Sequence, residues 1–393
     1  MIKRIKVLFL ASWYPSEEDP INGIFIRRHA ESVSEACDIS VISYHPTESK
    51  KDGLEISYYK DIQEIRIYQK KANNRYLFAL LQFKKILFFL MYFYKGFKII
   101  VNTKGKPDII HLNVIYPMGI AALFIYAIYK IPFIVTEHTS PFSIYTNNIF
   151  KRLYTRLILQ KAQYILPVSN SLKREMELFY RDNNYLVIPN IIDLPFLTKK
   201  NNKNIFSDKK NILHVSRLID HQKNISGIIL AISQIIKKRD DFRLEIIGDG
   251  PDREKLEKLA RRYGLSDKNI VFSGKKTNQQ LLESFHKSCF FILNSYHETF
   301  SIVCAEALAC GLPVIATRCG GPEEYINDKM GLLIEVDNKN QLIAAIEYML
   351  DHYSDYDKDY LQESILKKFN SKNIREQIKS VYTAVLKKDS TEP

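Results

Sequence analysis

Two glutamates stand eight residues apart in the stretch NSYHETFSIVCAEALACGLPVIAT at 294–317. Glu298 precedes a run of mostly apolar or small residues, and Glu306 lies inside it. A carboxylate that is removed from water costs roughly several kcal/mol unless hydrogen-bond donors or a cation meet it. Glu306 therefore needs a partner, either a ligand or an arginine elsewhere in the chain. Glu298 could equally do no more than complement the dipole of a helix that follows it.

The run after Glu298 predicts a buried helix from about Phe300 to Cys310. Thr299 or Ser301 is suited to its N-cap, and Gly311 is suited to the C′ position just beyond its end. The preceding run CFFILNS has the pattern of a buried strand. The start of the helix is therefore expected at the carboxyl end of a strand, the edge at which such sheets bind ligands.

This helix start is expected to bind an anion, because the first amides of a helix have no partner within the helix. A phosphate there would place a ribose near Glu306 and the group beyond the distal phosphate near Glu298. The donor-binding residues expected from this pattern are Thr299, Phe300, Ser301, Ile302 and Glu306.

Two cations follow the first strand of the same half of the chain, in HVSRLIDHQKN at 214–224. Arg217 and Lys223 are six residues apart in a strand-to-helix connection. A guanidinium and an ammonium at that edge can neutralise a diphosphate as it leaves. A solvated surface loop is the alternative interpretation.

Glycines end two neighbouring predicted strands, in EIIGDGP at 245–251 and FSGK at 272–275. Gly248 and Gly250 are expected to let the backbone approach a flat ligand such as a nucleobase.

Short apolar runs alternate with amphipathic stretches along the whole chain, which is typical of βαβ units with buried parallel strands. A second series of strands begins at NILHVSRL, after an Asn/Lys-rich linker at 189–210. The sequence therefore predicts an α/β protein of two doubly wound Rossmann-like domains that face each other across a cleft. We expect domains at 1–195 and 196–365, with a helix at 366–393 that crosses back to the first domain.

The motifs together resemble the GT-B glycosyltransferases of family 4, the glycosyl transferases group 1, which are retaining enzymes. The resemblance rests on WYPSEEDPINGIFIRRHAE, DIIHLNVIYPMGIAAL, FIVTEHTSPF, ILPVSNSLKREM, VIPNIID, HVSRLIDHQKN, LEIIGDGPDREKL, NIVFSGK and SYHETFSIVCAEALACGLPVIATRCGGPEEYI, in this order along nearly the whole chain. It implies transfer of a sugar from a nucleotide-diphosphate sugar to a glycan or lipid-linked acceptor in polysaccharide or glycolipid synthesis.

The resemblance assigns roles to individual residues. It implies that Glu306 binds the ribose, that Glu298 approaches the hydroxyls of the donor sugar, and that Arg217 and Lys223 hold the diphosphate. It also implies that the backbone of Gly23 meets the diphosphate and that His138 lies near the reacting sugar. Ser216 and Ile191 depart from the glycines that are common in the family, but neither change removes a charged group.

The sequence suggests no metal-ligand cluster and no carboxylate pair with the spacing of a nucleophile and an acid in the first half of the chain. We therefore expect catalysis without a metal or other cofactor, with Glu298, His138, Arg217 and Lys223 as the catalytic residues. A nucleotide-sugar epimerase or hydrolase on the same fold is an alternative.

The composition is that of a cytoplasmic globular protein with a net charge of +13. Five cysteines without C-x-x-C spacing indicate buried thiols in a reducing compartment. No run of about 18 charge-free apolar residues is present, so we expect no membrane-spanning segment. A basic nucleic-acid-binding protein is a further alternative, although no nucleic-acid motif appears and nucleic acid is not an expected partner.

The positive charge is concentrated at residues 60–106, which contain eleven Lys or Arg but only two acidic residues, Asp61 and Glu64. The stretch 76–98 combines this charge with aromatic residues. It predicts either a peripheral contact with the anionic inner face of the cytoplasmic membrane or a core helix with a solvated basic side. The anchors expected for a membrane contact are Tyr76, Phe78, Phe83, Phe88, Phe89, Tyr92, Phe93 and Phe97, with Lys84, Lys85, Lys95 and Lys98.

Overall fold

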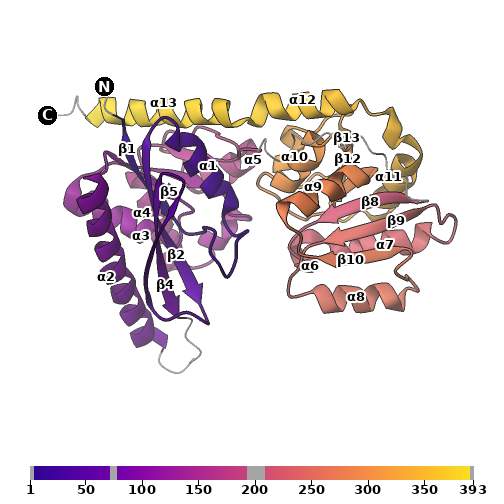
Figure 1. Cartoon of the computed structure of the whole chain (residues 1–393), viewed down its shortest axis with the longest axis horizontal. Helices are drawn as coiled ribbons and strands as arrows, with labels where there is room; N and C mark the ends of the chain where they lie inside the picture. The colour runs from indigo at the N-terminus through magenta and orange to yellow at the C-terminus, as the bar shows by residue number, and fades with distance from the viewer. Residues whose placement is uncertain (1–3, 71–77, 193–208, 390–393) are drawn as a thin grey trace. The chain divides into compact units, whose positions relative to one another are not determined.

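The structure, a computed structural model, describes residues 4–70, 78–192 and 209–389; the side chains of 78–83 and 389 lie outside the described part. It forms two compact units, Met1–Ile191 with Ser371–Pro393 and Ile192–Asn370 (Figure 1). Most of the expected linker, 193–208, falls outside the described residues.

The first unit contains a seven-stranded sheet in the order β3-β4-β2-β1-β5-β6-β7. All neighbouring strands are parallel except β3, which is antiparallel to β4 at the edge. The sequence analysis missed β3 and β4, because their alternating polar residues do not form an apolar run. The strands are β1 Lys6–Ala11, β2 Asp38–Thr47, β3 Gly53–Tyr59, β4 Ile62–Lys70, β5 Ile109–Asn113, β6 Phe133–Glu137 and β7 Ile165–Pro167.

Helices cover both faces of this sheet (Figure 1). Val41 of β2 belongs to the core that also contains residues of α1 and α13, whereas the next residue, Ile42, lies under Gly96 of α2. Successive side chains of a strand point to opposite faces, so α2 lies on the face opposite α1 and α13. The helices are α1 Ile24–Ser34, α2 Phe78–Lys104, α3 Gly119–Tyr129, η1 Phe142–Tyr145, α4 Ile149–Lys161, α5 Asn170–Phe179 and α13 Ser371–Asp389.

The C-terminal helix α13 belongs to the first unit. The hydroxyl of Tyr382 on α13 lies 2.6 Å from Nδ1 of His111, and His111 Nε2 lies 2.6 Å from the hydroxyl of Thr136. All three side chains are buried. His111 therefore joins the sheet to α13 and has a structural role.

The second unit contains a six-stranded parallel sheet in the order β10-β9-β8-β11-β12-β13. This is the strand order of the doubly wound fold, in which the direction of winding reverses between β8 and β11. The strands are β8 Lys210–Val215, β9 Phe242–Ile247, β10 Ile270–Gly274, β11 Phe290–Leu293, β12 Val314–Thr317 and β13 Gly331–Ile334.

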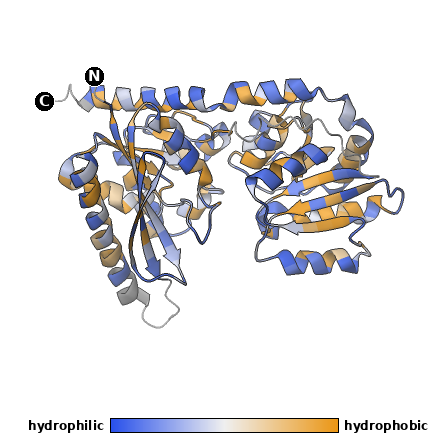
Figure 2. Ribbon diagram, in the orientation of Figure 1, coloured by the Kyte–Doolittle hydropathy of each residue, from blue (hydrophilic) through white to orange (hydrophobic). Residues whose placement is uncertain are grey.

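The core of the second unit is largely aliphatic and consists of the strands and the helices that pack on them. The strands of this unit are mostly hydrophobic, whereas its helices contain both hydrophobic and hydrophilic residues (Figure 2). The helices are α6 Asp220–Lys223, α7 Ile225–Ile235, α8 Arg253–Arg262, α9 Asn278–Lys287, α10 Ile302–Ala309, η3 Gly321–Glu324, α11 Lys339–His352, η4 Tyr353–Asp355 and α12 Lys358–Phe369.

The helix α2 differs from the sequence analysis in one respect and agrees with one of its two alternatives in another. Its segment Lys84–Lys104 is, among the described residues, a helix long and apolar enough to cross a membrane by length and composition, although no charge-free run of that length is present. Phe89, Phe93 and Phe97, named as anchors for a membrane contact, are buried, as the core-helix alternative expected, and the Phe89 ring lies 5.5 Å from that of Tyr44 on β2. The inner side of α2 is thus part of the protein core.

Candidate functional site

The second unit brings together the charged residues that were singled out from its sequence. Arg217 and Lys223 follow β8, and Glu298 follows β11. These strands are neighbours, with Ile212 opposite Phe290. They flank the point at which the sheet reverses its winding, and open α/β sheets bind ligands outside the carboxyl ends of such strands.

Lys223 and Glu298 form an ion pair, with 2.6 Å between Nζ and Oε1. The hydroxyl of Ser295 donates a second hydrogen bond to the same oxygen at 2.7 Å. Glu298 is only 9% exposed, so the ammonium offsets much of the cost of removing the carboxylate from water. The sequence analysis had assigned the two residues to different parts of a ligand, and the structure places them in contact.

The backbone around Glu298 is fixed by the loop after β12. The amide of Glu298 donates to Cys319 O, and Gly321 donates to Glu298 O, each at 2.8 Å. A Cβ at Gly321 would lie 2.2 Å from Thr299 O, so a side chain there would displace this backbone. The loop therefore positions both Glu298 and the start of α10.

The helix α10 begins two residues later than expected, at Ile302, and ends at Ala309. Ser301 occupies its N-cap with φ 61°, but the Ser301 side chain makes no capping hydrogen bond. The expectation of a cap from the Ser301 side chain was wrong, and the Ser301 hydroxyl is buried without a hydrogen-bond partner among the residues that the structure describes. Ser301 O accepts hydrogen bonds from Ala305 N and from the hydroxyl of Tyr325.

The end of α10 follows the prediction. Gly311 has φ 78°, its amide donates to Leu308 O, and the amide of Leu312 donates to Ala307 O. These two bonds form a Schellman motif, which favours glycine at C′. Glu306 lies in the middle of this short helix and is 6% exposed, so the helix presents a buried carboxylate close to its start.

Arg217 is exposed, and its side chain makes no hydrogen bond or ion pair with any described residue. Its backbone is nevertheless held firmly. Ser216 N donates to Ile247 O at 3.1 Å, and Leu218 N donates to Asp249 O at 3.0 Å. The guanidinium is thus available to an anion while the loop that carries it stays fixed.

Gly248 and Gly250 explain how this loop is held. A Cβ at Gly248, where φ is 130°, would lie 1.8 Å from Ser216 O, and one at Gly250 would lie 2.4 Å from Leu218 O. The interpretation that these glycines admit a flat ligand was therefore incomplete, because the backbone that approaches them is the loop bearing Arg217.

In the first unit, Gly23 is the N-cap of α1 and has φ 66°. A Cβ there would lie 2.4 Å from the carbonyl carbon and oxygen of Trp13. Both the positive φ and the close approach of the Trp13 backbone thus require glycine at this position. The contact that requires it is made within the protein and involves no ligand.

His138 directly follows β6 and is buried. Its ring lies 4.4 Å from that of Phe25 and 6.0 Å from that of His29. Burial holds the pKa of His138 well below its usual value, and His29 and His111 lower it further. The imidazole is therefore neutral at pH 7.

Glu137 fixes the backbone at this position. It is fully buried and accepts hydrogen bonds from the amides of Ile115, His138 and Thr139 at 2.9–3.0 Å. Burial raises the pKa of Glu137, and these hydrogen bonds oppose the rise. The sequence analysis did not single out Glu137, although its place between a buried strand and His138 was a usable signal.

A second buried carboxylate, Glu64 on β4, was also missed. It pairs with Arg66 and Arg27, and it accepts a hydrogen bond from the Tyr14 hydroxyl at 2.7 Å. Burial, followed by the charge of Glu64, raises the pKa of Tyr14. This cluster joins α1 to the sheet edge, and the polar residues of β4 were its only sign in the sequence.

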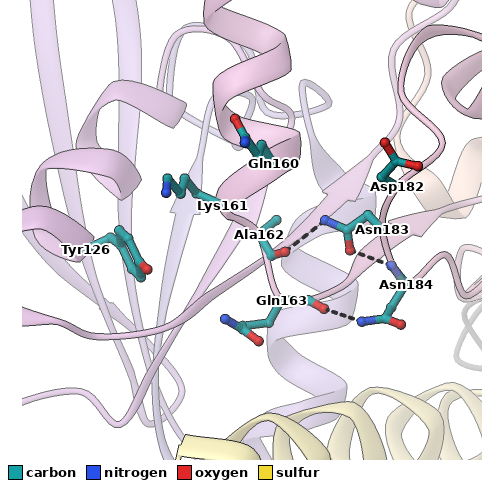
Figure 3. Close-up of a pocket in the computed structure, with 8 residues that line it drawn as sticks. All are labelled: Tyr126, Gln160, Lys161, Ala162, Gln163, Asp182, Asn183 and Asn184. Atoms are coloured by element: carbon teal, nitrogen blue, oxygen red, sulfur yellow. Dashed lines mark hydrogen bonds between the residues drawn. The ribbon is translucent and has the colours of Figure 1, made fainter. Parts of the chain in front are cut away.

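A hollow of about 320 Å³ lies in the first unit beside the ends of α3 and α4 (Figure 3). Its polar groups already serve the fold. Asn183 Nδ2 donates to Ala162 O, and Asn184 Nδ2 donates to Gln163 O (Figure 3). Asn183 Nδ2 also donates to Leu159 O. It contains none of the residues expected to carry chemistry, and we assign no site to it.

Among residues 4–70, 78–192 and 209–389, no group of three His, Cys, Asp or Glu side chains could hold a metal ion. The five cysteines are free thiols.

Comparison with known families decides the class of the protein. The family described as Glycosyltransferase Family 4 matches residues 25–196, and the family described as Glycosyl transferases group 1 matches residues 196–365. The chain belongs to these glycosyltransferases. The two matches together run from α1 almost to the end of α12.

Two relatives illustrate the range of this glycosyltransferase family. A Campylobacter jejuni N-acetylgalactosamine-N,N'-diacetylbacillosaminyl-diphospho-undecaprenol 4-alpha-N-acetylgalactosaminyltransferase is 29% identical, over 75% of this chain and 80% of its own length. The N-acetyl-alpha-D-glucosaminyl L-malate synthase of Bacillus anthracis is 27% identical, over 74% of this chain and 78% of its own length.

Solved structures of other proteins share the GT-B fold. Sucrose-phosphate synthase from Thermosynechococcus elongatus aligns with a TM-score of 0.79 at 20% identity, over 97% of this chain and 99% of that chain. Anabaena HepE, solved in complex with UDP, aligns with a TM-score of 0.73 at 16% identity, over 97% of this chain and 100% of that chain. The expected fold, two Rossmann-like domains of the GT-B class, is thus confirmed.

Proposed function

We propose that this glycosyltransferase transfers a sugar, with retention of anomeric configuration and without a metal, from a nucleotide-diphosphate sugar to a glycan or lipid-linked acceptor. The observation that carries the proposal is the group of charges at the β8–β11 reversal: the free guanidinium of Arg217, the Lys223–Glu298 pair and the adjacent start of α10. These are the charges that a leaving diphosphate and a sugar hydroxyl require.

Each residue has a distinct proposed role. Arg217 and Lys223 stabilise the charge that develops on the leaving diphosphate. The amides at the start of α10, from Thr299 through Ile302, hold a phosphate, and Glu306 accepts hydrogen bonds from the ribose. Glu298, oriented by Lys223, accepts a hydrogen bond from a hydroxyl of the donor sugar.

The first unit contributes Gly23 and His138 to this proposal. Gly23 offers its backbone amide to the diphosphate. His138, which is neutral, offers a hydrogen bond to the reacting sugar without adding charge. The departing phosphate then accepts the proton of the acceptor hydroxyl on the same face of the sugar. The HepE complex with UDP and the undecaprenol-linked substrate named for the Campylobacter relative support a nucleotide donor and a lipid-linked acceptor.

The donor is tested first by thermal shift with a panel of nucleotide sugars, since a ligand that binds the folded state stabilises it by mass action. Transfer is then measured with that donor and with isolated glycans and lipid-linked oligosaccharides. Glu306→Gln is expected to weaken donor binding, and Glu298→Gln to slow transfer, by ~2 to 4 kcal/mol each. Glu254→Gln, at an exposed carboxylate on α8, is the control.

Three results would contradict parts of this proposal. Wild-type turnover in both glutamine variants would remove the site assignment. Loss of activity in EDTA that magnesium or manganese restores would remove the metal-free mechanism. Consumption of the donor at one rate with and without any acceptor would favour the epimerase or hydrolase alternative.

We also propose that the enzyme works as a peripheral protein on the inner face of the cytoplasmic membrane, with residues 76–98 near the lipid. Lys84, Lys95 and Lys98 are exposed and attract anionic lipid by roughly 1 kcal/mol each. Replacing these three and Lys85 by glutamine should weaken co-sedimentation with anionic vesicles at low salt. An unchanged bound fraction in that variant would contradict this part of the proposal.

A further inference from the structure

The helices α2, α3 and α4 form one layer of the first unit. Phe124 of α3 lies 6.3 Å, ring to ring, from Tyr94 of α2. On its other side α3 meets α4, because a Cβ at Gly119 would lie 2.3 Å from Ile158 of α4. The outward side of this layer is therefore continuous from α2 to α4.

This layer has an unusual distribution of charge. The three helices together contain nine Lys or Arg and no Asp or Glu. Five of the basic residues lie on α2 and four on α4. A mixed surface of both signs is the ordinary arrangement for a protein that stays in water. A layer of one sign indicates an anionic partner.

The outward side of α4 is also apolar. Ile149 is 61% exposed, Phe150 79%, Leu153 59% and Leu157 44%. Three of them, Ile149, Leu153 and Leu157, are spaced at i, i+4 and i+8, so they form a single stripe on the helix. We call these four residues the α4 ridge. The opposite side of α4 is buried in the protein through Thr155, Ile158 and Leu159, so the ridge is not needed for folding.

Basic side chains flank the α4 ridge. At about 100° per residue, Arg152 and Arg156 lie along one border of the stripe and Lys161 lies along the other. All three are exposed. An apolar stripe bordered by Arg and Lys matches the interface of an anionic bilayer, where the stripe enters the acyl boundary and the cations meet the headgroups.

We propose that the α4 ridge inserts into the surface of an anionic lipid bilayer. The inference adds a second contact to the docking proposed for 76–98, whose Phe89, Phe93 and Phe97 are buried while Ile86, Leu87 and Met91 are exposed beside its lysines. It does not depend on the proposed transfer reaction. A second copy of this chain does not suit the ridge, because a two-fold contact would place like charges opposite each other. A nucleic acid satisfies the charge but gives four large apolar side chains no partner.

The first test measures co-sedimentation of the full chain with vesicles of phosphatidylglycerol and phosphatidylcholine, and of phosphatidylcholine alone. The combined variant Phe150→Gln, Leu153→Gln, Leu157→Gln is expected to lower partitioning onto anionic vesicles at least tenfold. The reduction should persist at high salt, because it arises from lost apolar insertion. Tyr263→Gln with Tyr348→Gln, which removes two exposed aromatic side chains of the second unit, should change nothing.

The second test measures how deeply the α4 ridge enters the bilayer. Phe150→Trp adds an indole at the most exposed position of the ridge, and its fluorescence should be quenched by lipids brominated along the acyl chain. The native Trp13 provides the background signal in the unmodified chain.

The proposal is overturned by wild-type partitioning in the ridge variant, or by absence of quenching in Phe150→Trp at saturating vesicles. It is also overturned if the protein does not co-sediment with anionic vesicles at low salt but binds a single-stranded oligonucleotide. That result would identify nucleic acid as the partner. Thermal unfolding of each variant distinguishes lost insertion from lost folding.

Discussion

Replacing Lys223 by methionine is expected to separate the structural role of the Lys223–Glu298 pair from its role in transfer. The change keeps the length and much of the apolar stem of the side chain but removes the ammonium that lies 2.6 Å from Glu298 Oε1. The Ser295 hydroxyl then remains as the donor that the structure shows on that oxygen. Glu298 becomes a nearly buried carboxylate with little compensation.

The magnitude follows from the burial of the pair. Breaking a fully buried ion pair from one side costs about 3 to 5 kcal/mol. Here the two side chains are 21% and 12% exposed, so water screens part of that loss. We expect the free energy of unfolding to fall by about 2 kcal/mol in Lys223→Met. Turnover should fall by about 100-fold, or about 2.7 kcal/mol in the activation free energy, because the diphosphate loses a fixed cation.

The double variant Lys223→Met, Glu298→Gln provides the decisive comparison. It removes the uncompensated charge, so urea unfolding should show that most of the lost stability returns. Its turnover should remain low, because the cation is still missing. Lys258→Met, which breaks an exposed pair with Glu254, is the control. It should change turnover by less than about twofold and the free energy of unfolding by less than about 0.5 kcal/mol. Recovery of turnover together with stability in the double variant would refute the catalytic role of Lys223.

Three further predictions concern single positions. Arg217→Ala should lower turnover about 100-fold, because the leaving diphosphate loses a cation. The unfolding midpoint should not change, because the exposed guanidinium has no partner among the described residues; a lowered midpoint would argue against this. Gly248→Ala should destabilise the protein by about 2 kcal/mol or more in urea unfolding, because its Cβ would lie 1.8 Å from Ser216 O at φ 130°; an unchanged midpoint would show that this loop relaxes. Burial lowers the pKa of His214 to about 4, so the unfolded state binds the proton first, and stability should fall as the pH drops from about 6.5 to 4. His214→Gln should reduce the slope of that part of the pH profile, to which His29 and His45, with pKa values lowered to about 4 by burial, also contribute.

The sequence by itself determined the class of fold and the strands of the second unit. All six were visible as short apolar runs, because parallel strands buried on both faces have few polar positions. Gly311 and the end of α10 were equally predictable, because a left-handed residue at C′ strongly favours glycine. The charged site residues could be named for a similar reason, since Glu306 within an apolar run and two cations after one strand are local features.

Tertiary structure decided the features that depend on partners distant in the chain. The edge hairpin of β3 and β4 was missed because its polar residues are buried by a cluster around Glu64, whose partners Tyr14 and Arg27 lie far away in sequence. The contact between Lys223 and Glu298 joins residues 75 positions apart, and it exists because β8 and β11 are neighbours. No local pattern encodes such neighbours.

The two amphipathic helices show the same limit. The composition of α2 revealed that it was aromatic and basic, but only packing against β2 showed that Phe89 faces the core. The sequence of α4 contains apolar residues on both of its sides. Which side faces the protein is decided by the neighbours that bury Ile158 and leave Phe150 and Leu153 in solvent. Hydrophobicity along a chain records which side chains are costly to leave in water, whereas the fold determines which of them it covers.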